Sequence, residues 1–129
     1  MRRSEEREQA FYLVFQTLFS GEPSEAIALY SEAMEPVGEY AKALYNGVSE
    51  KQAELDDIIA RYLKGWKINR LPKVNLSVLR LAVYEIIYCE DVPDSVAINE
   101  AVELGKKFAS QEDAAFINGV LGAFVRSRA

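Results

Sequence analysis

Apolar residues recur every three or four positions along most of the chain, with polar residues between them. Near the start, for example, Phe11, Val14 and Leu18 fall on one face of a helix. Later segments repeat this spacing, and no strand-like alternation of apolar and polar residues bounded by hairpin turns appears. The pattern therefore predicts an all-α fold.

Glycine, proline and capping residues divide this pattern into six predicted helices. The first begins near Ser4 and is broken by Gly21 and Pro23. The second is capped by Ser24 and runs toward Met34. The remaining breaks and starts are expected at Gly65, at Pro93, at Asp94 or Ser95, and at Glu112 or Asp113.

The segment GWKINRLPKV, residues 65–74, is the expected connector between two halves of the chain. A length of 129 residues suits one domain. We therefore predict a single domain over residues 1–129, built from two small helical bundles at about 1–65 and 74–129 that pack together. Gly47 lies inside the third predicted helix at a cost of roughly 1 kcal/mol relative to alanine, which indicates close packing of another helix.

The complete absence of histidine excludes several classes of enzyme and metal site. Ser-His-Asp and Cys-His catalytic systems need this residue, as do zinc sites that use histidine. The sequence has no glycine-rich nucleotide loop, and its sole cysteine, Cys89, suits packing better than chemistry. A group such as Glu50, Glu54 and Asp57 is more typical of a solvated surface than of a catalytic site. We therefore expect no cofactor and no metal, while an enzyme built only from carboxylates stays open at this point.

The sequence also bears on where the chain works. No apolar run approaches the roughly 18 residues of a membrane-spanning helix. The first residues are charged and lead into an amphipathic stretch, unlike the apolar core of a secretory signal. The expected location is the cytoplasm.

The net charge is −5, yet the cations gather in local clusters, whose potential acts within about 8 Å in physiological salt. The clusters are Arg2, Arg3 and Arg7; Lys64, Lys67, Arg70 and Lys73; Lys106 and Lys107; and Arg126 and Arg128. Only the first cluster opposes its local dipole, because the N-terminal end of a helix carries partial positive charge. An arginine at such an end is unfavourable unless an anion lies beside it.

The second half of the chain carries a distinctive series of short motifs. In order, they are Leu79–Arg80–Leu81, Tyr84–Glu85, Val92–Pro93, Ala97–Ile98–Asn99–Glu100–Ala101 and Phe116–Ile117–Asn118–Gly119–Val120–Leu121. Together with the arginine-rich start RRSEEREQAF, they resemble the NusB family of transcription antitermination factors in order and spacing. The helical plan of the whole chain is similar to that of the family.

This resemblance implies a function without catalysis. NusB proteins pair with NusE, a small-subunit ribosomal protein, and the pair binds the single-stranded boxA element of nascent RNA. The complex then joins RNA polymerase and suppresses premature termination, chiefly on ribosomal RNA operons. The expected partners of this chain are therefore boxA-type RNA, NusE and the RNA polymerase antitermination complex.

The resemblance also implies which residues bind RNA. Arg2, Arg3 and Arg7 stand where the basic motif of the family meets RNA phosphates, and a phosphate would make arginines at a helix start favourable. Phe15 stands at a position where relatives can carry tyrosine, so it offers a ring without a hydroxyl group.

Three further positions have a structural alternative. Phe116 matches a family aromatic near the RNA, where stacking of a base is worth about 1–3 kcal/mol, but it also fits the apolar face of the last predicted helix. Arg80 begins the exposed side of the fourth helix, from which it can reach phosphate or pair with Glu85. Asn75 matches a position near RNA and NusE, and it also suits the N-cap of the fourth helix.

Two hypotheses of different classes follow. The first is an RNA-binding adaptor that works with NusE. The second is a protein-binding helical scaffold or homodimer in which RNA binding is weak or lost. The second draws on the acidic composition, on Glu5 and Glu6 within the basic start, and on Ala115 at a position that is often basic in relatives.

Overall fold

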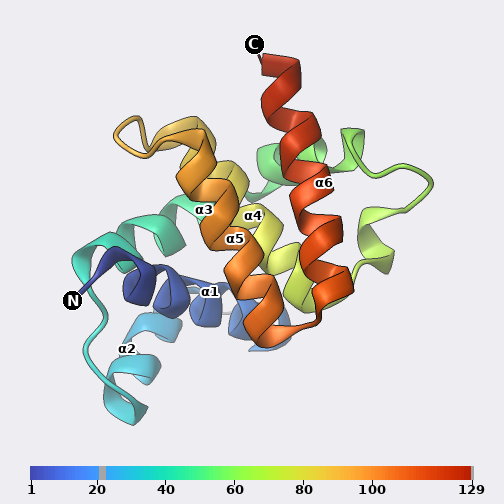
Figure 1. Cartoon of the computed structure of the whole chain (residues 1–129). Helices are drawn as coiled ribbons and strands as arrows, with labels where there is room; N and C mark the ends of the chain where they lie inside the picture. The colour runs from blue at the N-terminus through green and yellow to red at the C-terminus, as the bar shows by residue number, and fades with distance from the viewer. Residues whose placement is uncertain (21–22, 129) are drawn as a thin grey trace.

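The computed structural model describes residues 1–20 and 23–128, with the side chains of residues 20 and 23–26 left undescribed. Within these residues all regular secondary structure is helical, with no strand (Figure 1). The helices are α1 (Arg3–Ser20), α2 (Pro23–Ala33), α3 (Glu39–Arg61), α4 (Lys73–Tyr88), α5 (Asp94–Phe108) and α6 (Gln111–Arg128), with a short 3-10 turn, η1 (Ile68–Arg70), between α3 and α4. The predicted all-α fold is confirmed.

Several predicted helix starts are displaced by one to three residues. Proline occupies the N-cap positions of α4 and α5, as Pro72 and Pro93, and neither helix has a side-chain cap. Asn75, Asp94 and Ser95 therefore lie inside their helices, and the prediction that they act as caps was wrong. Proline has a fixed φ that suits entry into a helix, so no capping side chain is needed to begin one.

The sixth helix begins at Gln111, one residue before Glu112 and two before Asp113, the two predicted starts. Ser110 precedes it, and its hydroxyl oxygen accepts a hydrogen bond of 3.0 Å from the backbone amide of Asp113. Ser110 is thus the N-cap that sequence reasoning missed. The predicted break at Gly21 lies outside the described residues, and the predicted cap Ser24 lies outside the described side chains. Helix α2 begins at Pro23.

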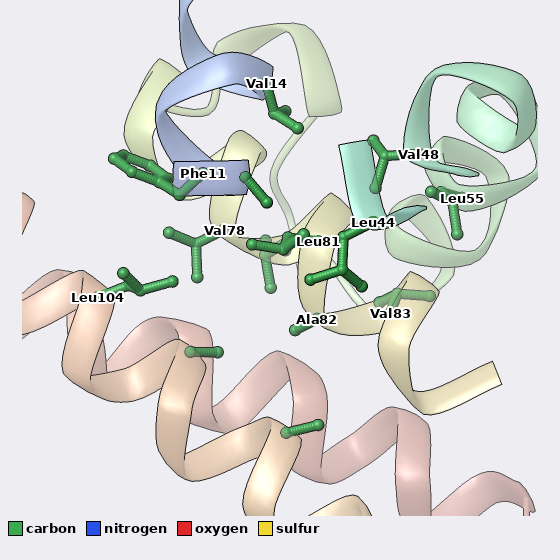
Figure 2. Packing of buried hydrophobic residues seen from close by; sticks show 14 of the residues in the cluster. Phe11, Val14, Leu44, Val48, Leu55, Val78, Leu81, Ala82, Val83 and Leu104 are labelled. Atoms are coloured by element: carbon green, nitrogen blue, oxygen red, sulfur yellow. The ribbon is translucent and has the colours of Figure 1, made fainter. Parts of the chain in front are cut away.

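Helix α4 lies at the centre of the molecule. It contacts α1 and α3 on one side and α5 and α6 on the other, and most of its residues are buried. Figure 2 shows the result, with side chains from α1, α3, α4 and α5 meeting in one apolar cluster. One continuous core is consistent with one domain. The cooperative unfolding of the two halves stays a prediction.

Polar side chains of α1 fix the start of α3. The Glu6 carboxylate accepts hydrogen bonds from the backbone amides of Tyr40, at 3.0 Å, and Ala41, at 3.3 Å. The Gln9 side-chain oxygen accepts another, of 3.0 Å, from the amide of Gly38. A carboxylate at a helix N-terminus satisfies free amides and complements the dipole. Glu6 therefore has a structural task within the arginine-rich start.

Gly47 packs closely against α4, as predicted. A Cβ atom at this position would overlap the ring of Tyr84. We expect Gly47→Ala to lower the free energy of unfolding by about 1–3 kcal/mol, since the ring must move within a packed interface. Gly119 on α6 is the matched control, because a Cβ there would meet no atom within 4 Å. Gly119→Ala should raise the free energy of unfolding by roughly 0.5–1 kcal/mol. Urea unfolding of the two variants measures both changes.

Candidate nucleic-acid interface

Arg2 and Arg3 lie on the surface at the start of α1. The Arg2 side chain is 82% exposed and its Nε atom lies 3.0 Å from a carboxylate oxygen of Glu5. The Arg3 side chain is 47% exposed, lies 3.0 Å from Asp91, and packs its guanidinium over the Tyr40 ring at 4.0 Å. Exposed ion pairs of this kind contribute little energy, so a phosphate can compete for both arginines.

Arg7 faces the interior, only one turn further along the same helix. Its side chain is 7% exposed, and its Nε atom donates hydrogen bonds of 2.8 and 3.0 Å to the two carboxylate oxygens of Glu85. Its Nη1 atom donates a third, of 3.3 Å, to Glu100. The expected placement of Arg7 beside Arg2 and Arg3 at the surface was therefore wrong.

Glu85, the main partner of Arg7, is itself buried and has a second partner. The Tyr40 hydroxyl donates a short hydrogen bond to the same carboxylate. Burial and the adjacent Glu85 carboxylate raise the pKa of Tyr40, which keeps the phenol protonated as a donor. We call Arg7, Tyr40, Glu85 and Glu100 the buried arginine cluster. It joins α1, α3, α4 and α5, and it explains why an arginine is tolerated near a helix start.

Arg80 is also buried rather than exposed. Its Nε and Nη2 atoms donate hydrogen bonds of 2.7 and 2.8 Å to the two carboxylate oxygens of Asp56 on α3. This bidentate pair uses Asp56 and not Glu85, the partner named in the alternative prediction. Both the expected exposure of Arg80 and its expected carboxylate partner were therefore wrong.

Asn75 lies in the first turn of α4, facing the start of α6. The residue is 2% exposed, and its Nδ2 atom donates a hydrogen bond of 2.9 Å to Asp113. This bond, followed by one of 2.8 Å that the Ser110 hydroxyl donates to the Asp113 carboxylate, lowers the pKa of Asp113. The Oδ1 atom of Asn75 is buried without a hydrogen-bond partner among the described residues. Asn75 thus joins the first turns of α4 and α6.

The two aromatic residues predicted to contact RNA are intermediate in exposure. Phe15 and Phe116 are both half-buried and pack against the core. Phe15 stacks on Phe11 with ring centroids 5.8 Å apart and meets the ring of Phe19 edge-on at 5.1 Å. Phe19 is the most exposed of this aromatic row, at 65%, and sequence reasoning missed it. The spacing of four residues from Phe11 through Phe15 to Phe19 is the signal that could have found it.

The predicted residues therefore do not converge on one point. Arg2 and Arg3 lie at one end of α1 and the aromatic row lies toward the other, about 18 Å away at 1.5 Å per residue. Arg7 and Arg80 lie inside the molecule. Such a layout suits an extended ligand with regularly spaced charges better than a compact small molecule. Among the described helices, none is both long enough and apolar enough to cross a membrane.

Comparison with known proteins gives a consistent result. The sequence model of the NusB family matches residues 4–126. The transcription antitermination protein NusB of Pelotomaculum thermopropionicum is 43% identical over 131 residues, which cover 98% of this chain and 91% of that protein. A chain from the crystal structure of a plectonemic RNA supercoil matches with a TM-score of 0.91 and 34% identity, covering 99% of this chain and 97% of its own length.

A second solved structure is similar over almost its full length. It is the crystal structure of antitermination factors NusB and NusE in complex with double-stranded RNA. The matching chain has a TM-score of 0.87 and is 30% identical, with 98% of this chain and 99% of that chain covered. The likeness therefore extends over the whole arrangement of helices described above.

Proposed function

Because this chain belongs to the NusB family, we propose that it is a transcription antitermination factor that binds boxA RNA together with NusE. The complex joins RNA polymerase and suppresses premature termination, mainly on ribosomal RNA operons. The chain works in the bacterial cytoplasm, where nascent RNA is made, and it catalyses no reaction. The observation that carries this proposal is the match to the family over residues 4–126, a range that includes all or nearly all of each of the six α-helices.

The solved relative supports the two kinds of partner. NusB and NusE form a complex with RNA in that structure, and its NusB-like fold is shared by this chain. An extended single-stranded RNA also suits exposed arginines at one end of α1 and partly exposed aromatic rings toward the other. RNA phosphates meet the arginines, and bases stack on the rings.

The proposed RNA-binding residues have different tasks. Arg2 and Arg3 bind phosphates directly, and Phe15 and Phe116 provide partly exposed rings. Arg7 and Arg80 contribute by holding α1 and α4 in place through their carboxylate pairs. Asn75 is itself buried, and by joining α4 to α6 it supports the surface that meets NusE.

The proposal is tested by measuring RNA affinity with and without NusE. Fluorescence anisotropy with a labelled boxA RNA should show weak binding by the chain alone, since only two arginines at the start of α1 are exposed. Adding NusE should tighten binding, because each partner lowers the binding cost of the other. The affinity for a scrambled RNA should increase little when NusE is added. Equal affinity for boxA RNA with and without NusE would instead favour a protein-binding scaffold.

The two exposed arginines make a separate prediction about salt dependence. Arg2→Ala/Arg3→Ala should reduce the slope of log affinity against log salt by about 1.4, at roughly 0.7 per phosphate of a single strand. The weakening should be similar for boxA and scrambled RNA, since phosphate contacts do not read sequence. The matched control is Lys42→Ala/Lys106→Ala, which removes two partly exposed, ion-paired lysines from α3 and α5. An equal loss of slope in the control would show that net charge alone sets the affinity.

A further inference from the structure

The connector between α3 and α4 carries a concentration of positive charge that the proposed function leaves unused. Residues 58–84 contain six arginines and lysines but no aspartate or glutamate, in a chain whose net charge is −5. Two of these cations, Arg61 and Arg80, pair with Asp57 and Asp56. The other four have no carboxylate within ion-pair distance among the described residues. They are Lys64, Lys67, Arg70 and Lys73, and all four are exposed.

A tryptophan lies among these cations. Trp66 is 58% exposed, although a ring of this size is usually well buried. The preceding residue, Gly65, has a φ of +76°, a backbone conformation that favours glycine. Gly65 therefore turns the chain directly before the exposed ring. We call Lys64, Trp66, Lys67, Arg70 and Lys73 the connector surface.

The connector surface has an ordered base. Leu63 and Leu71, which bracket most of it, are 7% and 8% exposed and belong to the core. Between them, η1 is closed by a hydrogen bond of 2.9 Å from the Arg70 amide to the Lys67 carbonyl. In Figure 1 the connector is the green segment on the right, and the N-terminus lies on the left. The cations and the ring are therefore presented on a fixed turn, which lowers the entropy lost when a ligand binds.

The connector surface is continuous with the aromatic row of α1. The Lys73 ammonium lies 5.7 Å from the ring centroid of Phe19, the exposed member of that row. A strand of RNA that stacks near Phe15 and leaves toward Phe19 would therefore meet Lys73 next. Beyond it lie three unpaired cations and one exposed ring. Alternation of cations and flat rings is the usual composition of a surface that binds single-stranded nucleic acid without reading its sequence.

We propose that the connector surface binds single-stranded RNA that flanks boxA, with phosphates on its four cations and one base stacked on Trp66. This site rests on the proposed RNA-binding function and extends it to a sequence-independent segment of the transcript. The flanking contact lengthens the RNA footprint and strengthens binding beyond what Arg2 and Arg3 supply.

The ring itself gives a direct test, because Trp66 is the sole tryptophan of the chain. Titration of the full chain with oligouridine RNA, which lacks boxA, should quench the tryptophan fluorescence as a base stacks on the ring. Because oligouridine contains no boxA, this titration tests the connector surface even if the chain fails to bind boxA RNA in the anisotropy experiment. Absence of quenching by oligouridine would overturn the proposal. Stronger quenching by polyglutamate or by phosphatidylserine vesicles would also overturn it, by assigning the surface to an acidic protein or a membrane.

Two sets of variants separate charge from stacking. Lys64→Gln/Lys67→Gln/Arg70→Gln should reduce the salt slope for boxA RNA with uridine flanks by about 2, and leave the slope for boxA RNA without flanks unchanged. The control Lys42→Gln/Lys106→Gln/Lys107→Gln removes the same charge from other surfaces. Trp66→Ala should weaken binding of the flanked RNA by roughly 5-fold to 150-fold, the range for one stacked base, whereas Trp66→Phe should keep most of the affinity. Equal losses in the control, or equal losses for flanked and unflanked RNA, would contradict the site.

Discussion

Replacement of Arg7 by methionine should lower the free energy of unfolding by about 3–5 kcal/mol. Methionine keeps most of the length of the side chain but leaves the buried Glu85 carboxylate without its main cation. Arg7 is 7% and Glu85 is 3% exposed at their side chains, so water cannot readily take the place of the guanidinium. Denaturant unfolding followed by circular dichroism measures the change.

The control for this variant is Arg3→Met, one turn earlier on α1. Arg3 and its partner Asp91 are 47% and 67% exposed, and such a pair is worth at most about 1 kcal/mol. Arg7→Met/Glu85→Gln should recover part of the loss, because a neutral amide still accepts from Tyr40 and carries no charge to compensate. If Arg7→Met costs no more than Arg3→Met, the buried arginine cluster is not a stabilising feature.

Leu79→Ala is expected to destabilise by about 2–5 kcal/mol, through lost burial and the cavity that remains. Leu79 lies on the central helix α4 and is 0% exposed. Because α4 contacts helices of both halves, we expect the variant to keep one cooperative unfolding transition with a lower midpoint. Two separated transitions would contradict the prediction of a single domain over residues 1–129.

The comparison for Leu79 is a leucine of the same size at the surface. Leu29 on α2 is 59% exposed, and Leu29→Ala should change stability by no more than about 0.5 kcal/mol. A negligible effect of Leu79→Ala, equal to that of Leu29→Ala, would mean that the apolar face of α4 is placed wrongly.

Local sequence signals predicted the helices well because each depends on neighbouring residues. The apolar period, Gly65 and the prolines define the helices, and Gly47 correctly indicated a close helix contact. Cap positions were less accurate, because Pro72 and Pro93 begin helices without any side-chain hydrogen bond. A search for capping side chains cannot detect a helix of this kind.

The candidate site was harder to predict because its ion pairs join residues far apart in sequence. Arg7 and Glu85 are separated by 78 positions, and Arg80 and Asp56 by 24. One local signal was available, since Arg7 precedes Phe11 by one turn and so shares its inward face. For Arg80 no such signal exists, because α4 is buried on almost every side.

The positions of Glu6 and Phe19 show two further limits. When charges are counted along the sequence, Glu6 only reduces the positive charge of the N-terminal segment. In the structure its carboxylate, on α1, caps the start of α3. Phe19 continues an apolar row and therefore resembles a core residue, although it lies beyond the edge of the core. Charge counts and helical spacing describe a residue on its own helix, and only the packed structure shows what faces it.

Transcription through a terminator tests the central claim most directly. The template carries boxA upstream of a terminator, and the assay contains bacterial RNA polymerase, NusE and the other factors of the antitermination complex. The account predicts that adding this chain increases the fraction of full-length transcripts, that scrambling boxA removes the increase, and that Arg2→Ala/Arg3→Ala reduces it. Equal readthrough with and without the chain, on a template where a known NusB protein raises it, would contradict the account.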